Sequence, residues 1–406
     1  MTAAVRPLIV AGAGPAGLTT SLAAAALGVP VTVVERERED RERPGSRALY
    51  VHRDSLRLLE RASPGLGRTI AESGIVWRRR VTTFRGRTVY SHDTPERTVE
   101  DLPPYTCLRQ VDTERLLLRA CRTAGVDVVW GAGVRAIDVE PSGVVVHGLD
   151  GRSRAGAYLV GADGARSAVR TSLGTPLVGA RSSSYHVVVD LADDPDRPGP
   201  ADRVFHYHHP GLGGRHVLVV PFAGGRQVDL QCRPDDDPVE MASTAGVRRW
   251  LPAVLDDAYL ARILWTASYP FLQRVAESLV DAHRRVLLVG EAGHLFAPFG
   301  ARGMNSGIAD GDAAATAIAT ALGATNPGRA RGAVEDFDRA RLRAAERNRR
   351  AAAAALAHMR PARRVTRVRQ VAAAALAPAV PRLGSWLEHA PYGPRTVAPG
   401  PSEGRY

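Results

Sequence analysis

A glycine-rich turn near the start of the chain limits the possible folds most strongly. It reads Gly12-Ala13-Gly14-Pro15-Ala16-Gly17 and matches the pattern GxGxxG. A short apolar run from Leu8 to Ala11 precedes it, an alanine-rich helix follows it as far as Gly28, and Val31 to Val34 form a second apolar run. In this order of strand, turn, helix and strand, the glycines permit a tight turn and let the backbone approach a pyrophosphate closely. The stretch therefore predicts a Rossmann-like α/β domain that binds a dinucleotide, with a glycine-rich turn that holds no ligand as the alternative.

A carboxylate at the end of the second apolar run refines this prediction. Glu35 follows Gly17 by 18 residues, where an acidic side chain accepts hydrogen bonds from a ribose diol. The same carboxylate repels a 2′-phosphate, which indicates FAD or NAD rather than NADP as the dinucleotide. Arg36 comes next in the chain and is expected at the same site.

A second glycine-rich segment lies later in the chain, between Arg285 and Asp312. Val286 to Val289 form a continuous apolar run, as in a parallel strand that is buried on both faces. The glycines that follow are Gly300, Gly303 and Gly307. They leave the backbone uncovered, and a helix is expected from about Met304. The loop thus presents backbone N–H groups and the positive end of a helix dipole, which suit an anion or an electron-rich ring. A plain strand–loop–helix crossover is the alternative.

Composition and charge argue against several kinds of partner. The chain has 406 residues, of which 45% are hydrophobic, enough for more than one core. Of the net charge of +12, residues 329–370 carry 13 Arg against 4 acidic residues, or 13 − 4 = +9. The charge is therefore not spread over a face that could bind nucleic acid. Glycines and prolines interrupt the longest uncharged run, Pro7 to Val34, so a membrane span is not expected and we predict a cytoplasmic protein.

The cysteines are Cys107, Cys121 and Cys232. Three widely spaced cysteines fit neither a disulfide framework nor a zinc cluster. We expect buried thiols and no metal site.

Changes in polarity pattern and composition along the chain divide it into several parts. Runs such as Val204 to His209 alternate in polarity, as in a half-buried strand of an antiparallel sheet. Prolines and glycines accumulate after Pro391, which is typical of disorder. We expect a dinucleotide-binding domain in three parts (1–74, 99–176 and 281–330), an inserted substrate-binding sheet (75–98 and 177–280), a C-terminal helical region (331–390) and a disordered tail (391–406).

The arginine-rich segment 339–370 is predicted to be a helical cover packed on the body of the protein. Val365, Val368, Val371 and Ala372 recur at helical spacing and form an apolar stripe, which is expected to face inward with the arginines outside. A basic amphipathic helix also suits an anionic membrane surface, and this remains the alternative.

Three glycine-bearing segments occur in one order: GAGPAG at 12–17, GADGARS at 161–167 and GEAGHLFAPFGARGMNSGIAD at 290–310. In this order and context, over roughly residues 5–345, the chain resembles the single-component FAD-dependent aromatic hydroxylases, which share the p-hydroxybenzoate hydroxylase fold. The sequence departs from the family in two places. Glu291 stands where the family usually has Asp, and Ala313 stands where Asn is frequent.

The resemblance implies a set of FAD contacts, with NADPH or NADH docking transiently because no second GxGxxG is present. The residues implied are Gly12, Gly14, Pro15, Ala16, Gly17, Glu35, Arg36, Arg47, Arg109, Gln110, Asp163, Gly164, Glu291, Pro298, Gly300, Gly303, Met304 and Asn305.

The implied chemistry belongs mainly to the cofactor. In this family NAD(P)H reduces the FAD, and oxygen from O2 is transferred to an aromatic or polyketide-type molecule through a flavin C(4a)-hydroperoxide. Baeyer–Villiger oxidation and epoxidation occur on the same fold, and a non-catalytic FAD- and ligand-binding protein is a further alternative. The sequence contains no GxSxG, HExxH or CxxC pattern and no WxWxIP pattern of flavin halogenases. A homodimer is compatible with the resemblance.

Two histidines are the candidates for acid–base work on the substrate. In a strand, Val204, His206 and His208 share one face, and Phe205, Tyr207 and His209 share the other. A histidine with a pKa near neutrality can accept the proton of a phenol. We expect His206 or His208 to face the substrate, with exposed strand residues of no catalytic role as the alternative.

Overall fold

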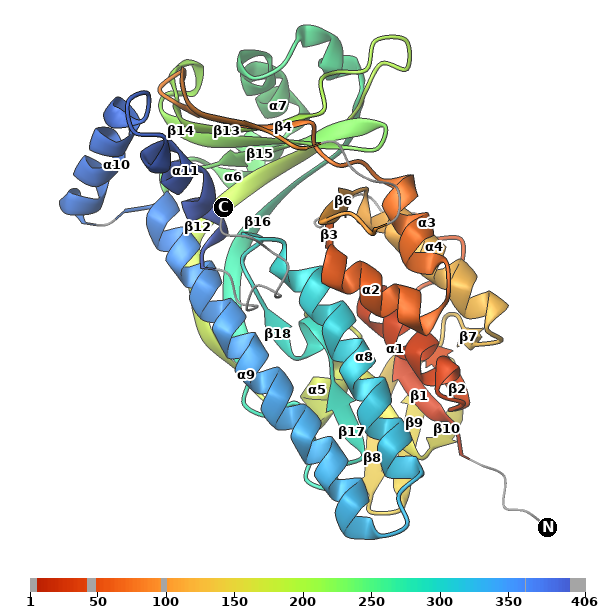
Figure 1. Cartoon of the computed structure of the whole chain (residues 1–406). Coiled ribbons are helices and arrows are strands. Elements are labelled where there is room, and N and C mark those ends of the chain that lie inside the picture. Colours follow the sequence, from red (N-terminus) through yellow and green to blue (C-terminus); the bar gives the residue numbers. More distant parts are fainter. Residues whose placement is uncertain (1–5, 42–48, 96–100, 362, 395–406) are drawn as a thin grey trace.

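The computed structural model describes residues 6–41, 49–95, 101–361 and 363–394. A parallel sheet forms one half of the molecule (Figure 1). Its strand order is β17 (Val286–Leu288), β11 (Tyr158–Gly161), β1 (Leu8–Ala11), β2 (Val31–Val34) and β7 (Asp127–Val129). All its neighbouring strands are parallel. The predicted α/β, Rossmann-like architecture is therefore confirmed.

Two helices carry the glycine-rich segments and pack tightly together. They are α1 (Pro15–Ala26) and α8 (Arg302–Leu322). A Cβ on Gly307 would lie 3.2 Å from the Cβ of Ala16, and one on Gly311 would lie 2.7 Å from the Oγ1 of Thr20. Small residues at these positions therefore allow the two helices to approach closely. This contact brings the two predicted ligand-binding segments to the same end of the sheet.

Smaller elements complete this half. A meander of β8 (Val134–Glu140), β9 (Gly143–Gly148) and β10 (Ser153–Gly156) lies beside α5 (Ala168–Ser172). On the other side are α2 (Arg53–Ala62), α3 (Leu66–Ser73), α4 (Gln110–Thr123) and the pair β3 (Tyr50–His52) and β6 (Tyr105–Cys107). The cysteines are buried and free, as predicted.

An eight-stranded sheet forms the other half. Its order is β18 (His294–Leu295), β16 (Ile263–Ala276), β12 (Leu177–Ala192), β15 (Gly225–Gln231), β14 (Arg215–Phe222), β13 (Asp202–His209), β4 (Arg79–Phe84) and β5 (Arg87–Asp93). The strand pairs are antiparallel apart from β13 with β4. One face is covered by α6 (Pro238–Ala242), α7 (Thr244–Trp250) and short 3-10 turns (Figure 1). The inserted antiparallel sheet predicted from the sequence is confirmed.

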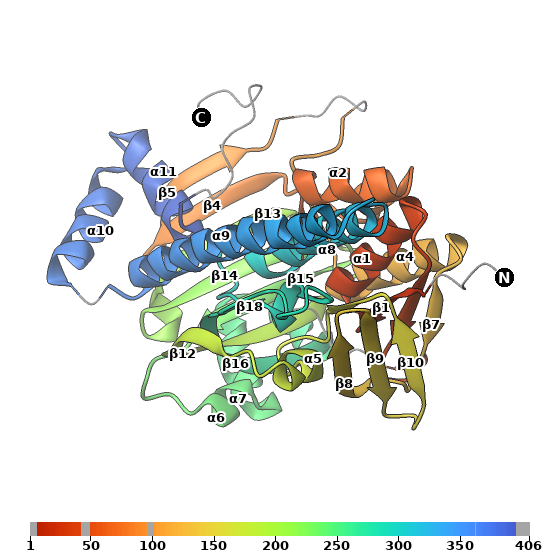
Figure 2. The ribbon, with the colours of Figure 1, turned by 90° about the horizontal axis from the view of Figure 1, so that it is seen from below.

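Three helices follow: α9 (Pro327–Met359), α10 (Arg364–Leu376) and α11 (Pro381–His389). The long helix α9 passes from α8 to the eight-stranded sheet and so ties the two halves together (Figure 2). The prediction that the valine stripe of α10 faces inward is wrong, because Val365 is 68% exposed and Val368 is 66% exposed. The buried side is instead polar and small. Gln370 donates from Nε2 to the carbonyl oxygen of His358 at 2.8 Å, and Ala373 packs beside it. Among the described residues, no helix combines the length and hydrophobicity that crossing a membrane requires.

The start of the predicted disordered tail is ordered. Pro391 is buried in a 3-10 turn, and Arg302 donates to the carbonyl oxygens of Tyr392 and Pro394, both at 2.9 Å. Composition alone did not reveal this, because the partner that holds the segment lies far away in the sequence. Residues 395–406 lie outside the described part of the chain.

Candidate functional site

One large cavity lies between the two halves of the molecule. Its volume is about 2590 Å³, and it is lined by the GxGxxG turn, the loop before α8 and one face of the eight-stranded sheet. Pockets for a drug-sized ligand hold about 300–1,000 Å³. The cavity therefore has room for a dinucleotide and a second molecule.

The GxGxxG turn has the geometry of a pyrophosphate site. Gly12 has φ +103°, and a Cβ on Gly17 would lie 1.9 Å from the carbonyl oxygen of Gly12. A Cβ on Gly14 would meet nothing within 4 Å, so this side of the turn is open, and Gly14 lines the cavity. Pro15 begins α1, whose N-terminus has no side-chain cap. Its backbone N–H groups are thus available for an anion.

Glu35 lies beside this turn and lines the cavity together with Arg36. Its Oε2 accepts from the N–H of Ala13 at 2.6 Å, and its Oε1 accepts from the N–H of Glu37 at 3.0 Å. Burial opposes ionisation, but these N–H groups and the Arg41 guanidinium hold the pKa of Glu35 below its usual value. A carboxylate has about four acceptor positions, so Oε2 keeps capacity for a ribose hydroxyl. The sequence pattern does not single out Arg41, because it stands in a charged run that is typical of a solvated loop.

Asp163 and Gly164 also line the cavity. The carboxylate of Asp163 accepts from the N–H groups of Ala168 and Val169 at 2.7 and 3.1 Å, and from the hydroxyl of Ser167. The side chain therefore caps α5 and fixes the turn. Gly164 has φ +79° and open space where a Cβ would be, so the backbone of the turn faces the cavity.

The loop before α8 presents backbone to the cavity. Pro298, Gly300, Gly303 and Met304 line it, and Gly303 has open space at its Cβ position. Ala301, at the N-cap of α8, is held at φ 53°, a strained conformation for a residue other than glycine.

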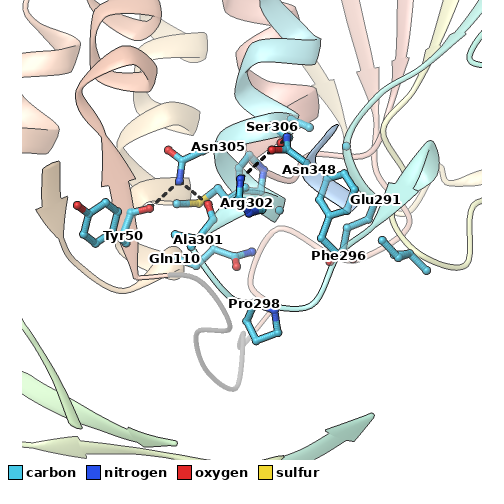
Figure 3. Close-up of a pocket in the computed structure, with 18 of the residues that line it drawn as sticks. Tyr50, Gln110, Glu291, Phe296, Pro298, Ala301, Arg302, Asn305, Ser306 and Asn348 are labelled. Atoms are coloured by element: carbon cyan, nitrogen blue, oxygen red, sulfur yellow. Dashed lines mark hydrogen bonds between the residues drawn. The ribbon is translucent and has the colours of Figure 1, made fainter. Parts of the chain in front are cut away.

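Asn305 clamps this loop instead of pointing a free amide at a ligand (Figure 3). Its Nδ2 donates to the carbonyl oxygens of Tyr50 at 2.9 Å and Ala301 at 2.7 Å. Its Oδ1 accepts from the N–H of His52 at 2.9 Å and from the hydroxyl of Ser55 at 2.7 Å. The side chain thus joins the first turn of α8 to β3 and α2.

Of the four remaining predicted cofactor residues, two line the cavity, one does not, and one lies outside the described residues. Gln110 lines the cavity and donates to Glu114 at 2.8 Å, and Glu291 lines it with an exposed side chain (Figure 3). Arg109 is not among the lining residues, and its Nε donates to Asp112 at 3.0 Å. Arg47 lies outside the described residues.

The structure places neither His206 nor His208 among the residues that line the cavity. His206 pairs with Val217, whose side chain belongs to the core on the other face of the sheet. Its Nδ1 is 2.9 Å from the hydroxyl of Thr83, and burial lowers its pKa to about 4. His208 interrupts the strand at φ 51° and lies 3.3 Å from the carbonyl oxygen of Gly214. The predicted alternation holds from Val204 to Tyr207 but is wrong beyond it, because the register shifts: the ring of His208 lies 4.6 Å from that of His216, and the ring of His209 lies 5.0 Å from that of His206. The face expected to meet the cavity was also wrong, because the side that His206 shares with Val204 and Val217 faces the core that includes α7.

The cavity face of the sheet carries residues that the sequence pattern did not single out. His186, His216, Gln227, Asp229 and Gln231 line it from three neighbouring strands. Alternation within each strand groups them by face, but it does not say which strands are neighbours. A cluster of aromatic rings lies at another wall, where Tyr50 stacks on Tyr105 at 4.3 Å and lies 5.4 Å from the ring of Trp77.

Comparison with known proteins agrees with this geometry. The family model described as "FAD binding domain" matches residues 5–358, so the chain belongs to this family of FAD-binding proteins. The structure is similar to p-nitrophenol 4-monooxygenase PnpA from Pseudomonas putida DLL-E4, with a TM-score of 0.77 and 24% identity. The match covers 96% of this chain and 99% of that one.

The curated relatives include proteins from Streptomyces. The 6-methylpretetramide 4-monooxygenase of Streptomyces rimosus is 30% identical over 319 residues, which are 75% of this chain and 54% of that protein. The dialkyldecalin synthase of Streptomyces rugosporus is 27% identical over 312 residues, which are 75% of this chain and 63% of that protein. The chain thus spans less than two thirds of the length of either relative.

Proposed function

We propose that this protein is an FAD-dependent monooxygenase that uses NAD(P)H and O2 to hydroxylate an aromatic or polyketide-type small molecule. The observation that supports this most is the single cavity, which runs from the GxGxxG turn past the N-terminus of α8 to the buried face of the eight-stranded sheet. A dinucleotide and a substrate can therefore occupy the same cavity.

The residues present fit FAD. The turn at Gly12 to Gly17 and the N-terminus of α1 would hold the pyrophosphate, and Glu35 would accept hydrogen bonds from the adenosine ribose. Arg36, Gln110, Asp163, Gly164 and Glu291 line the same cavity, and the loop from Pro298 to Met304 offers a backbone surface for a flat ring. When bound, FAD supplies hydride acceptance from NAD(P)H and the activation of O2.

The protein contributes orientation, charge and exclusion of water. The first turn of α8 directs the positive end of a 21-residue helix toward the loop, which would stabilise negative charge on an electron-rich ring. The rings of Tyr50, Trp77 and Tyr105 offer flat apolar surface to an aromatic substrate. Polar groups on the cavity face of the sheet would orient its hydroxyl or carbonyl groups.

Oxygen transfer is tested on the purified holoenzyme. We expect a yellow protein that releases FAD on denaturation, since the GxGxxG turn, which contains only Gly, Ala and Pro, offers no side chain for a covalent bond to the cofactor. Phenolic aromatic compounds should stimulate NAD(P)H oxidation, and mass spectrometry after reaction under ¹⁸O2 should show one labelled oxygen atom in a hydroxylated product.

Other outcomes identify the alternatives. Lactone or epoxide products would indicate Baeyer–Villiger oxidation or epoxidation. Conversion without incorporated oxygen would support a cyclisation of the kind that the name of the dialkyldecalin synthase suggests, and would refute a monooxygenase. Absence of FAD would refute the proposal altogether. We also propose a cytoplasmic location. A homodimer is a separate proposal, which light scattering of the purified protein tests.

A further inference from the structure

A histidine and an aspartate form a buried pair on the cavity face of the eight-stranded sheet. His186 on β12 is 3% exposed, and its Nδ1 is hydrogen-bonded to Oδ1 of Asp229 on the neighbouring strand β15. The other ring nitrogen, Nε2, is buried and has no hydrogen-bond partner among the described residues. A buried polar atom without a partner is costly, so a ligand group is expected to meet it.

The position of His186 is where the sheet meets the loop before α8. Its ring lies 4.3 Å from that of Phe271 on β16 and 6.0 Å from that of Phe299, in the loop itself. His186 and Phe299 both line the cavity. The imidazole therefore lies in the part of the cavity nearest the loop that is proposed to hold the flavin ring.

A second buried donor lies beside this nitrogen. Gln231 is the direct cross-strand partner of His186, so their side chains share one face, and its Nε2 is also buried without a partner among the described residues. An acceptor and a donor side by side match a hydroxyl group, which gives its proton to one and accepts a hydrogen bond from the other.

We propose that His186 accepts the proton of a phenolic or enolic hydroxyl of the substrate, that Asp229 positions it, and that Gln231 holds the resulting oxyanion. This rests on the proposed function and names the substrate class as one with an acidic hydroxyl on its reacting ring. Because Asp229 accepts from Nδ1–H, the neutral imidazole presents a lone pair at Nε2. The substrate O–H bond breaks and an Nε2–H bond forms. The electron pair stays on the oxygen, which makes the ring more nucleophilic.

The second histidine of the cavity face, His216, is engaged elsewhere. The titratable groups that face His186 are Asp229 on β15, His216 on β14 and Tyr269 on β16. His216 accepts the N–H of His208 at 3.1 Å, and burial lowers its pKa to about 3. It is therefore neutral near pH 7 and a poor proton acceptor.

The test uses hydroxyanthraquinones, whose anions absorb at longer wavelength than the neutral molecules, titrated with holoenzyme across pH. Wild-type protein should shift the ionisation of the bound probe to lower pH by at least one pH unit. His186→Gln should abolish that shift, and Asp229→Asn should reduce it. His206→Gln, which changes a histidine on the opposite face of the same sheet, should keep it. FAD content and thermal unfolding of each variant verify that the fold is intact.

The possible results separate the two proposals. An unchanged probe spectrum in a folded His186→Gln variant, or a wild type that favours the anion of none of the probes, overturns the role of His186. If wild type oxygenates a phenol while His186→Gln keeps the same pH profile and the same coupling of NAD(P)H use to product, the proposed function stands and this inference falls. If the probe shift depends on His186 but no oxygen is transferred, the inference stands and the proposed function falls.

Discussion

A buried ion pair fixes α11 to the eight-stranded sheet. Arg203 on β13 is 1% exposed and donates from Nη1 to Oε2 of Glu388 on α11, at 2.6 Å, and Glu388 is fully buried. The hydroxyls of Thr82 and Tyr392 also donate to this carboxylate. We predict that Glu388→Gln, which keeps the shape and removes the charge, destabilises the protein by about 3–5 kcal/mol.

The magnitude follows from the geometry. Two charges whose centres are about 4 Å apart attract by about 4 kcal/mol at an effective dielectric constant of about 20. The neutral amide removes this attraction and leaves the guanidinium of Arg203 buried without a counter-ion. Glu346→Gln is the matched control, since that carboxylate pairs with Arg349 on α9 but both side chains are partly exposed. Its loss should stay below about 0.5 kcal/mol.

Urea unfolding, followed by the fluorescence of the five tryptophans, measures both variants. The double variant Arg203→Met/Glu388→Leu, which has no buried charge, should recover much of the stability lost in Glu388→Gln. A loss in Glu388→Gln no larger than in the control would refute the reasoning, as would a double variant no more stable than the single one.

Further predictions concern the cofactor site and the segment that supports it. Gly14→Ala has room for its Cβ in the protein alone, so its stability to unfolding should be unchanged. Its Kd for FAD, measured by fluorescence, should rise about tenfold or more. Unchanged affinity would argue against pyrophosphate at this turn. Glu35→Arg should also lose FAD, and full flavin occupancy would exclude the ribose role. Burial opposes ionisation of Asp310, but His294 and Arg341 lower its pKa from 3.8 to about 2. Because this pKa is depressed, the carboxylate contributes about 2 kcal/mol above pH 4, and the contribution is lost as pH falls toward 2. Asp310→Asn should therefore be less stable at pH 7 by about that amount, with a difference that shrinks in acid; a difference independent of pH would contradict the assignment.

Much of the half that contains the parallel sheet is encoded in short stretches of sequence. The positive φ of Gly12 and the absence of a Cβ at Gly17 are demands of one turn, so six consecutive residues were enough to predict it. The apolar runs at Leu8 to Ala11 and Val286 to Val289 predicted buried parallel strands for the same reason, because burial on both faces requires unbroken hydrophobicity. The order of the glycine-bearing segments then indicated the family.

Only the tertiary structure decided which face of each element lines the cavity, packs into a core or meets solvent. A period of two divides β13 into two faces, but the cavity face was determined by the helices that cover the other one, so His206 was assigned to the wrong side. The valines of α10 formed a regular stripe, yet the helix buries its glutamine side because His358 offers that side a hydrogen-bond acceptor. His186 and Asp229 lie 43 residues apart and meet only because β12 and β15 are neighbours. Sequence periodicity describes each element by itself, whereas a site between elements depends on which surfaces pack together.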